Sequence, residues 1–179
     1  MIQQLDASIL FWIQEHIRCG FLDRAMPLIT TLGDGGLLWI ALAIVFLLFR
    51  KTRLWGLAMG LALIIGLVIG NACLKPLIGR IRPFDWYDGI TLLIQAPGDF
   101  SFPSGHTLSA FAAASALFGF DKRVGMGAIT LAALIGFSRL YLFVHYPTDV
   151  LAGCALGVLF GVFSGFVVRR YSAKVWENG

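Results

Sequence analysis

Long, uninterrupted runs of apolar residues constrain this chain more than any other feature of its sequence. An α-helix needs ~20 residues to cross the hydrocarbon core of a bilayer. Five runs approach or reach that length, and they cover residues 35–49, 54–74, 106–120, 124–141 and 150–168. The chain is 58% hydrophobic and 13% charged, about half the charged fraction of an ordinary soluble domain. We therefore predict an all-α, polytopic transmembrane helical bundle with five clear spans.

The N-terminal segment has a different pattern. The apolar side chains of its first part fall largely on one face of a helix, and they are Leu5, Ile9, Trp12, Ile13 and Ile17. This pattern is typical of an amphipathic helix that lies in the membrane interface. A second, shorter apolar piece follows at residues 21–32. The two pieces together are long enough for a broken or tilted sixth span, and the sequence leaves both alternatives open.

These patterns divide the chain into interfacial or partial-span helices (1–34), a membrane core (35–171) and a tail (172–179). Basic side chains gather in alternate connections and after the last run: Arg50, Lys51, Arg53, Lys122, Arg123, Arg169, Arg170 and Lys174. Because basic connections stay in the cytoplasm, we expect a cytoplasmic tail, with residues 75–105 and 142–149 on the opposite side. The same distribution accounts for the net charge of +4, so we expect a bilayer partner and no nucleic acid.

The two outer connections and their flanks carry an unusual set of ionisable side chains: Lys75, Arg80, Arg82, His106, Arg139, His145 and Asp149. A single Lys or Arg at the end of a span is commonly an anchor that reaches the interface. Several cations on the translocated side, however, run against the orientation rule. Nearby carboxylates are few, so an anionic ligand such as phosphate is the natural partner.

The segment Pro103-Ser104-Gly105-His106 opens one of the predicted spans. Serine is a preferred N-cap, and the free N–H groups at a helix start form a site for anions. Gly105 would let the backbone approach a ligand closely. Ordinary capping of a membrane helix explains Ser104 equally well, but it does not explain a histidine in the first turn.

His145 and Asp149 lie four residues apart, with Pro147 between them at the expected start of the last span. A carboxylate in the first turn of a helix can be a simple N-terminal cap. Alternatively, Asp149 accepts a hydrogen bond from Nδ1–H of His145. That bond would fix the tautomer and present Nε2 as a nucleophile or base.

Together these segments resemble the three signatures of the type-2 phosphatidic acid phosphatase superfamily. The first is Lys75 and Arg82-Pro83, separated by six residues, and the second is Pro103-Ser104-Gly105-His106. The third is Ser138-Arg139, five residues, His145, three residues and Asp149. All three occur complete and in order over residues 75–149.

The resemblance implies a phosphate site. Lys75, Arg82 and Arg139 would hold the phosphate oxygens, and Ser104 and the backbone N–H of Gly105 would complete the cradle. These cations would stabilise charge that Mg²⁺ offsets in other phosphoryl-transfer enzymes. The resemblance therefore implies catalysis with no metal and no other cofactor.

It also implies catalytic roles for three side chains. His145 would attack phosphorus and form a phosphohistidine, Asp149 would orient His145, and His106 would protonate the leaving oxygen. Arg80 lies outside the motif, and we expect it at most to assist.

The short chain resembles bacterial members of the family that act on lipid phosphates or polyprenyl diphosphates. We therefore expect a multi-pass protein of the bacterial inner membrane, with its site on the extracytoplasmic side. Undecaprenyl diphosphate, phosphatidylglycerol phosphate and phosphatidic acid all fit, as does transfer of phosphate to an acceptor other than water. A transporter is disfavoured because the spans hold no charge near their middle. The sequence gives no indication of the oligomeric state.

Overall fold

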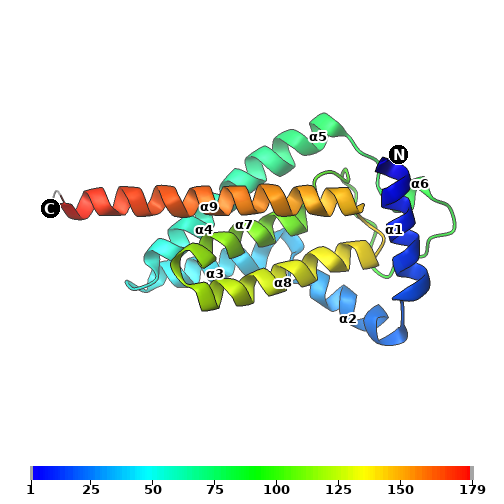
Figure 1. Ribbon diagram of the computed structural model, residues 1–179, viewed down its shortest axis with the longest axis horizontal. Coiled ribbons are helices and arrows are strands. Elements are labelled where there is room, and N and C mark those ends of the chain that lie inside the picture. The colour runs from blue at the N-terminus through cyan, green and yellow to red at the C-terminus, as the bar shows by residue number, and fades with distance from the viewer. Residues whose placement is uncertain (1, 178–179) are drawn as a thin grey trace.

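The computed structural model describes residues 2–177, and every regular element in that range is a helix. Figure 1 shows a bundle of long helices with one short helix across its end. The elements are α1 (Ile2–His16), α2 (Gly20–Thr31), η1 (Asp34–Gly36), α3 (Leu37–Leu48), α4 (Arg53–Ile65), η2 (Gly66–Leu74), α5 (Lys75–Ile78), α6 (Pro83–Trp86), α7 (Gly105–Phe120), α8 (Lys122–Tyr141) and α9 (Pro147–Glu177). Residues 178 and 179 of the predicted tail lie outside the described range.

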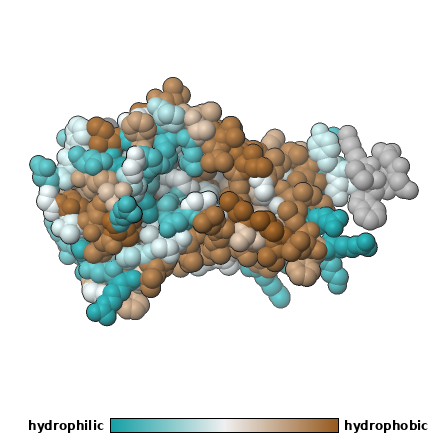
Figure 2. Space-filling view, turned by 180° about the vertical axis from the view of Figure 1, so that it is seen from behind, coloured by the Kyte–Doolittle hydropathy of each residue, from teal (hydrophilic) through white to brown (hydrophobic). Residues whose placement is uncertain are grey.

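Four helical stretches are long and apolar enough to cross a bilayer: Gly20–Leu48, Arg53–Trp86, Lys122–Tyr141 and Pro147–Ser172. Each of the five predicted spans is a helix, which confirms the all-α, polytopic bundle. Figure 2 shows the corresponding surface, with apolar side chains over the middle and polar side chains gathered toward the two ends.

The third predicted span, α7, has only 16 residues and lies inside the bundle. Its packing surface is rich in alanine, and Ala110, Ala112, Ala113, Ala114 and Ala116 are all fully buried. Because α7 is covered by α9, α8 and α4, it needs less lipid-facing surface than its neighbours. This explains why the run at 106–120 is short.

Helices α7 and α9 approach each other closely because one face of α9 carries glycines at every fourth position. A Cβ atom at Gly153, Gly157 or Gly161 would lie 2.8, 2.7 or 2.5 Å from the carbonyl oxygen of Ser104, Leu108 or Ala112. Small residues at these positions let two membrane helices pack backbone to backbone. This contact sets the distance between the starts of α7 and α9, where the candidate site lies.

The N-terminal helix α1 lies across the end of the bundle, as expected for an interfacial helix (Figure 1). It turns Asp6, Leu10 and Ile13 toward the protein, while Leu5 and Trp12 of the predicted apolar face are 63% and 53% exposed. Helix α2 does not join α1 in a separate sixth span. It continues, across the break at η1, into the stretch Gly20–Leu48.

We predict that Gly161→Ala destabilises the protein, because the added methyl group would lie 2.5 Å from the carbonyl oxygen of Ala112. Overpacking of this kind typically costs about 1–3 kcal/mol. Gly127→Ala in α8 is the matched control, since its Cβ meets nothing within 4 Å. Thermal unfolding in detergent should show a lower midpoint for Gly161→Ala alone. Equal midpoints would mean that the α7–α9 contact is not tight.

Candidate active site

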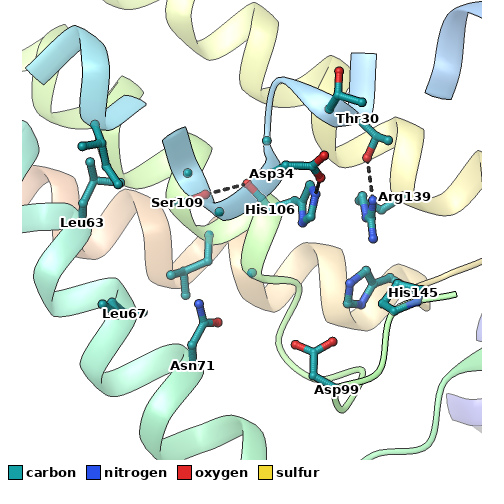
Figure 3. Close-up of a pocket in the computed structure, with 18 of the residues that line it drawn as sticks. Thr30, Asp34, Leu63, Leu67, Asn71, Asp99, His106, Ser109, Arg139 and His145 are labelled. Atoms are coloured by element: carbon teal, nitrogen blue, oxygen red, sulfur yellow. Dashed lines mark hydrogen bonds and ion pairs between the residues drawn. The ribbon is translucent and has the colours of Figure 1, made fainter. Parts of the chain in front are cut away.

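The predicted motif residues meet at one end of the bundle, around a pocket of about 1050 Å³. They arrive from separate elements: the region after η2, the start of α7, the end of α8 and the α8–α9 connection (Figure 3). Six of them line the pocket, namely Lys75, Arg82, Gly105, His106, Arg139 and His145. Ser104 and Asp149 do not line the pocket, and both are fully buried.

His145 and Asp149 form the contact that their spacing predicts, although it is long. Nδ1 of His145 lies 3.5 Å from Oδ2 of Asp149. The same oxygen accepts hydrogen bonds from the hydroxyl of Ser101 and from the backbone N–H of Tyr146. On the other side of the ring, Nη1 of Arg82 lies 3.2 Å from Nε2. The ring therefore turns Nδ1 toward the carboxylate and Nε2 toward the cations.

The environment of His145 keeps its imidazole neutral. Burial lowers the pKa of His145 to about 3, and the charges of Arg82 and Arg139 act in the same direction, against the opposing effect of Asp149. A neutral ring that places Nδ1–H toward Asp149 carries its lone pair on Nε2. His145 is thus prepared to act as a nucleophile or base at neutral pH.

Arg80 lies outside the motif, yet it forms ion pairs with two buried carboxylates at the site. Its guanidinium donates to Oδ1 of Asp149 at 2.5 Å and to Oδ2 of Asp6 at 2.7 Å. Asp6, on α1, also accepts from the backbone N–H and the hydroxyl of Thr148 at the start of α9. Asp6 was not identified from the sequence, where its signal is that it is the one charged side chain of residues 2–13.

Lys75 and Arg82 share one carboxylate, that of Asp99 in the long connection before α7. Both side chains donate to Asp99, and Nε of Arg82 also donates to its backbone oxygen at 2.7 Å. Partial burial would raise the pKa of Asp99, but the hydrogen bonds and charges of Lys75 and Arg82 lower it to about 2. The ionised carboxylate of Asp99 therefore lies between these two cations.

Arg139 is a buried cation without a counter-ion among the described side chains. It is 2% exposed, and its single hydrogen-bond partner is the hydroxyl of Thr30 on α2, at 2.5 Å. Its Nε atom has no partner. Burying a charge is costly unless it is paired and hydrogen-bonded, so the guanidinium of Arg139 is a candidate group for binding an anion in the pocket.

Ser104 is the N-cap residue of α7, but its side chain does not cap the helix. The hydroxyl pairs with that of Thr107 at 2.9 Å, and the backbone N–H donates to the carbonyl of Asp149. A Cβ atom at Gly105 would lie 3.0 Å from Oδ1 of Asn71. Gly105 thus permits a close approach of η2, whereas a phosphate contact of Ser104 stays a prediction.

His106 faces the pocket from the start of α7 and contacts a residue that the sequence analysis did not identify. Its Nε2 lies 2.8 Å from Oδ1 of Asp34 in η1 (Figure 3). No motif marks Asp34. Its one sequence signal is its position between Gly33 and Gly35, just before an apolar run.

The pocket continues away from the charged residues into an apolar groove between α3 and α4. Ile40 and Ile44 line it from α3, and Leu63 and Leu67 line it from α4 and η2. Figure 3 shows Leu63, Leu67 and Asn71 along one helical segment that leads toward the site. The arrangement joins a cationic end to an apolar channel, as an amphiphilic ligand would require.

Comparison with known proteins finds clear relatives. The family model of the PAP2 superfamily matches residues 54–173. An undecaprenyl-diphosphatase of Sulfolobus acidocaldarius is 35% identical over 120 residues, which are 66% of this chain and 58% of that relative. A lipid A 4′-phosphatase of Bacteroides thetaiotaomicron is 28% identical over 192 residues, covering 99% of this chain and 83% of the relative. A solved PAP2-type phosphatidylglycerolphosphate phosphatase from Bacillus subtilis superposes with a TM-score of 0.77 at 31% identity, covering 97% of this chain and 87% of that one.

We predict that His145 stays neutral well below the usual titration range of histidine, near ~6.5, because burial lowers its pKa to about 3. NMR of imidazole-labelled protein in detergent can follow each of the 3 histidines, with His145→Ala identifying the relevant signal. The His145 signal should keep its neutral position from about pH 8 to about pH 5. Titration near 6.5 would show that the cations and the burial do not act on His145 as described.

Proposed function

Because this chain belongs to the PAP2 superfamily, we propose that it hydrolyses a lipid phosphate or a polyprenyl diphosphate through a phosphohistidine on His145. The observation that carries the proposal is the buried guanidinium of Arg139, which has no carboxylate partner within the described chain, beside a neutral His145. Both line the same pocket as Lys75 and Arg82. A phosphoryl group bound there would supply the missing anion.

In the first step, Nε2 of His145 attacks phosphorus and the bond from phosphorus to the leaving oxygen breaks. His106 gives a proton to that oxygen, and the phosphoryl group stays on His145. In the second step, water attacks the phosphohistidine while His106 takes the proton of the water. Phosphate then leaves, and both histidines return to their starting states.

The cations stabilise the charge that spreads over the equatorial oxygens during both transfers. Lys75, Arg82 and Arg139 are fixed before the substrate arrives, so little reorganisation is needed at the moment of reaction. Asp149 offsets the positive charge that develops on His145 as it bonds to phosphorus. In this scheme the carboxylate of Asp99 yields its place on Lys75 and Arg82 to the phosphate. The three cations supply the stabilisation that a metal ion supplies elsewhere, so we propose a metal-independent reaction.

The pocket supports a substrate that comes from the bilayer, because its apolar groove continues between α3 and α4. The names of the relatives include an undecaprenyl diphosphate, a lipid A phosphate and a phosphatidylglycerol phosphate. These compounds share a phosphate ester or anhydride next to a long apolar chain. We propose that class for this protein.

We further propose that the site faces the extracytoplasmic side of a bacterial inner membrane and that the C-terminus is cytoplasmic. Helix α9 runs from the end that holds the site to the opposite end of the bundle (Figure 1). Its basic residues Arg169 and Arg170 lie near that opposite end. The connections with Lys51 and Lys122 join helices there as well, and the positive-inside rule makes that end cytoplasmic.

We predict that the purified protein releases phosphate from lipid phosphates in the presence of EDTA and that vanadate inhibits it. Arg139→Ala should lower kcat by roughly 10²–10³-fold, the usual loss when one donor to a transition-state oxyanion is removed. Arg24→Ala on α2 is the matched control, because Arg24 is exposed. A panel of lipid monoesters and a polyprenyl diphosphate, compared by kcat/KM, identifies the preferred substrate. Abolition of activity by EDTA and its recovery with Mg²⁺ would contradict the mechanism.

We predict that cysteines placed singly at Asp99 and at Lys122 react from opposite sides of the membrane. The background lacks Cys19, Cys73 and Cys154. An impermeant thiol reagent added to intact cells should label position 99 and leave position 122 unlabelled until the membrane is opened. The reverse pattern would place the site in the cytoplasm, and labelling of both positions from outside would refute the predicted topology.

A further inference from the structure

A short glycine-rich loop brings a carboxylate to the proposed general acid. Asp34 lies in η1, between α2 and α3, and its Oδ1 is 2.8 Å from Nε2 of His106. The two residues are 72 positions apart in the chain. Figure 3 shows the Asp34 carboxylate directed at the imidazole across the pocket wall.

The loop is built for this approach. Gly35 and Gly36 have φ values of +58° and +67°, a left-handed conformation that glycine adopts without strain. A Cβ atom at Gly33 would lie 2.7 Å from Cδ2 of His106 and 3.0 Å from Cγ2 of Ile135. Only a residue without a side chain fits between the loop and the ring, so the backbone of Gly33 packs directly against His106.

These contacts identify the nitrogen of His106 that remains available to a substrate. The Cδ2 edge of the ring lies against Gly33, and Nε2 lies against Asp34. Nδ1 makes no hydrogen bond within the described chain, yet it is not among the buried polar atoms that lack a partner. Nδ1 is therefore accessible, and the pocket that His106 lines is the space it can reach.

The charges around His106 make this carboxylate important. Arg139 on α8 and Lys75 after η2 line the same pocket, and both disfavour a positive imidazole. Asp34 is the acidic side chain in direct contact with the ring. A general acid must carry its proton before it can transfer it, and Asp34 favours that protonated form.

We propose that Asp34 is a positioning residue for the general acid: it accepts Nε2–H of His106 and holds Nδ1–H toward the leaving oxygen. The inference rests on the proposed function. In the first transfer the Nδ1 proton passes to the leaving oxygen as its bond to phosphorus breaks. His106 then stays neutral with Nε2–H on Asp34. In the second transfer Nδ1 takes a proton from the attacking water, which restores the starting state.

The two proposed carboxylate–histidine pairs differ in a way that makes Asp34 testable. Asp149 is fully buried and also holds Arg80, Ser101 and the backbone of Tyr146, so its loss would disturb several contacts. The side chain of Asp34 is 57% exposed, and its one ion pair within the described chain is with His106. Replacing Asp34 therefore leaves the rest of the site intact.

The test compares Asp34→Asn, His106→Ala and the double variant on two substrates, a long-chain alkyl phosphate and nitrophenyl phosphate. Asp34→Asn should lower kcat on the alkyl ester by roughly 10–100-fold, the range found when the carboxylate that orients a metal-bound histidine is removed. Its loss on the nitrophenyl ester should be only a few-fold, because that leaving group needs little protonation. In the His106→Ala background, Asp34→Asn should cause no further loss. Asp34→Glu, which keeps the carboxylate, should recover part of the activity.

Asp88→Asn is the matched control, because Asp88 is an exposed carboxylate on the outer connection. Asp34→Asn behaving like Asp88→Asn on the alkyl ester would overturn the inference. Equal losses on both esters, or a loss that adds to that of His106→Ala, would show a structural or phosphate-binding role and overturn it as well. If the wild type released phosphate from no lipid, the proposed function itself would fail, and that result is separate from those above.

Discussion

The crowding of positive charge at one end of an apolar bundle is the constraint on which the rest of the site depends. Lys75, Arg82 and Arg139 are each less than a tenth exposed and line one pocket. Like charges held this close, away from bulk water, repel one another strongly. Asp99 contacts two of them but supplies only one negative charge, and the third has no ion-pair partner among the described side chains. These three cations outnumber the carboxylates that pair with them in the described chain, and this is the physical reason that a phosphoryl group should bind there.

Helix packing gives these charges their fixed positions. The glycines of α9 bring the starts of α7 and α9 together, and the backbone N–H of Ser104 reaches the carbonyl of Asp149. On the other side, α1 is tied to the site by the ionic contacts between Asp6 and Arg80. A helix that was expected to lie in the interface or to form part of a sixth span therefore also supports the carboxylate that contacts His145. Fixed donors of this kind need little rearrangement when charge develops on a substrate.

The sequence predicted the spans and the family correctly because both depend on local patterns. Long apolar runs indicate helices that cross a membrane, and the three motifs are recognised by their fixed spacing. The contacts of Asp6, Asp34 and Asp99 could not be predicted in the same way. Asp6 meets Arg80, and Asp34 meets His106, across more than 70 residues, and no spacing links the partners. Short segments such as η1 acquire their role only when tertiary packing places them. Ser104 was correctly predicted as the N-cap of α7. Its hydroxyl, however, pairs with that of Thr107 and does not cap the helix, which the spacing could not predict.

The proposed mechanism depends on a covalent bond between phosphorus and His145. The direct measurement is to mix purified protein with ³²P-labelled lipid phosphate, quench within milliseconds in alkali, and map the label by peptide mass spectrometry. The mechanism predicts an acid-labile phosphoryl group on His145 that is absent from His145→Ala and that disappears as phosphate is released. Label on His106 instead, or steady turnover with no labelled protein at any quench time, would contradict it.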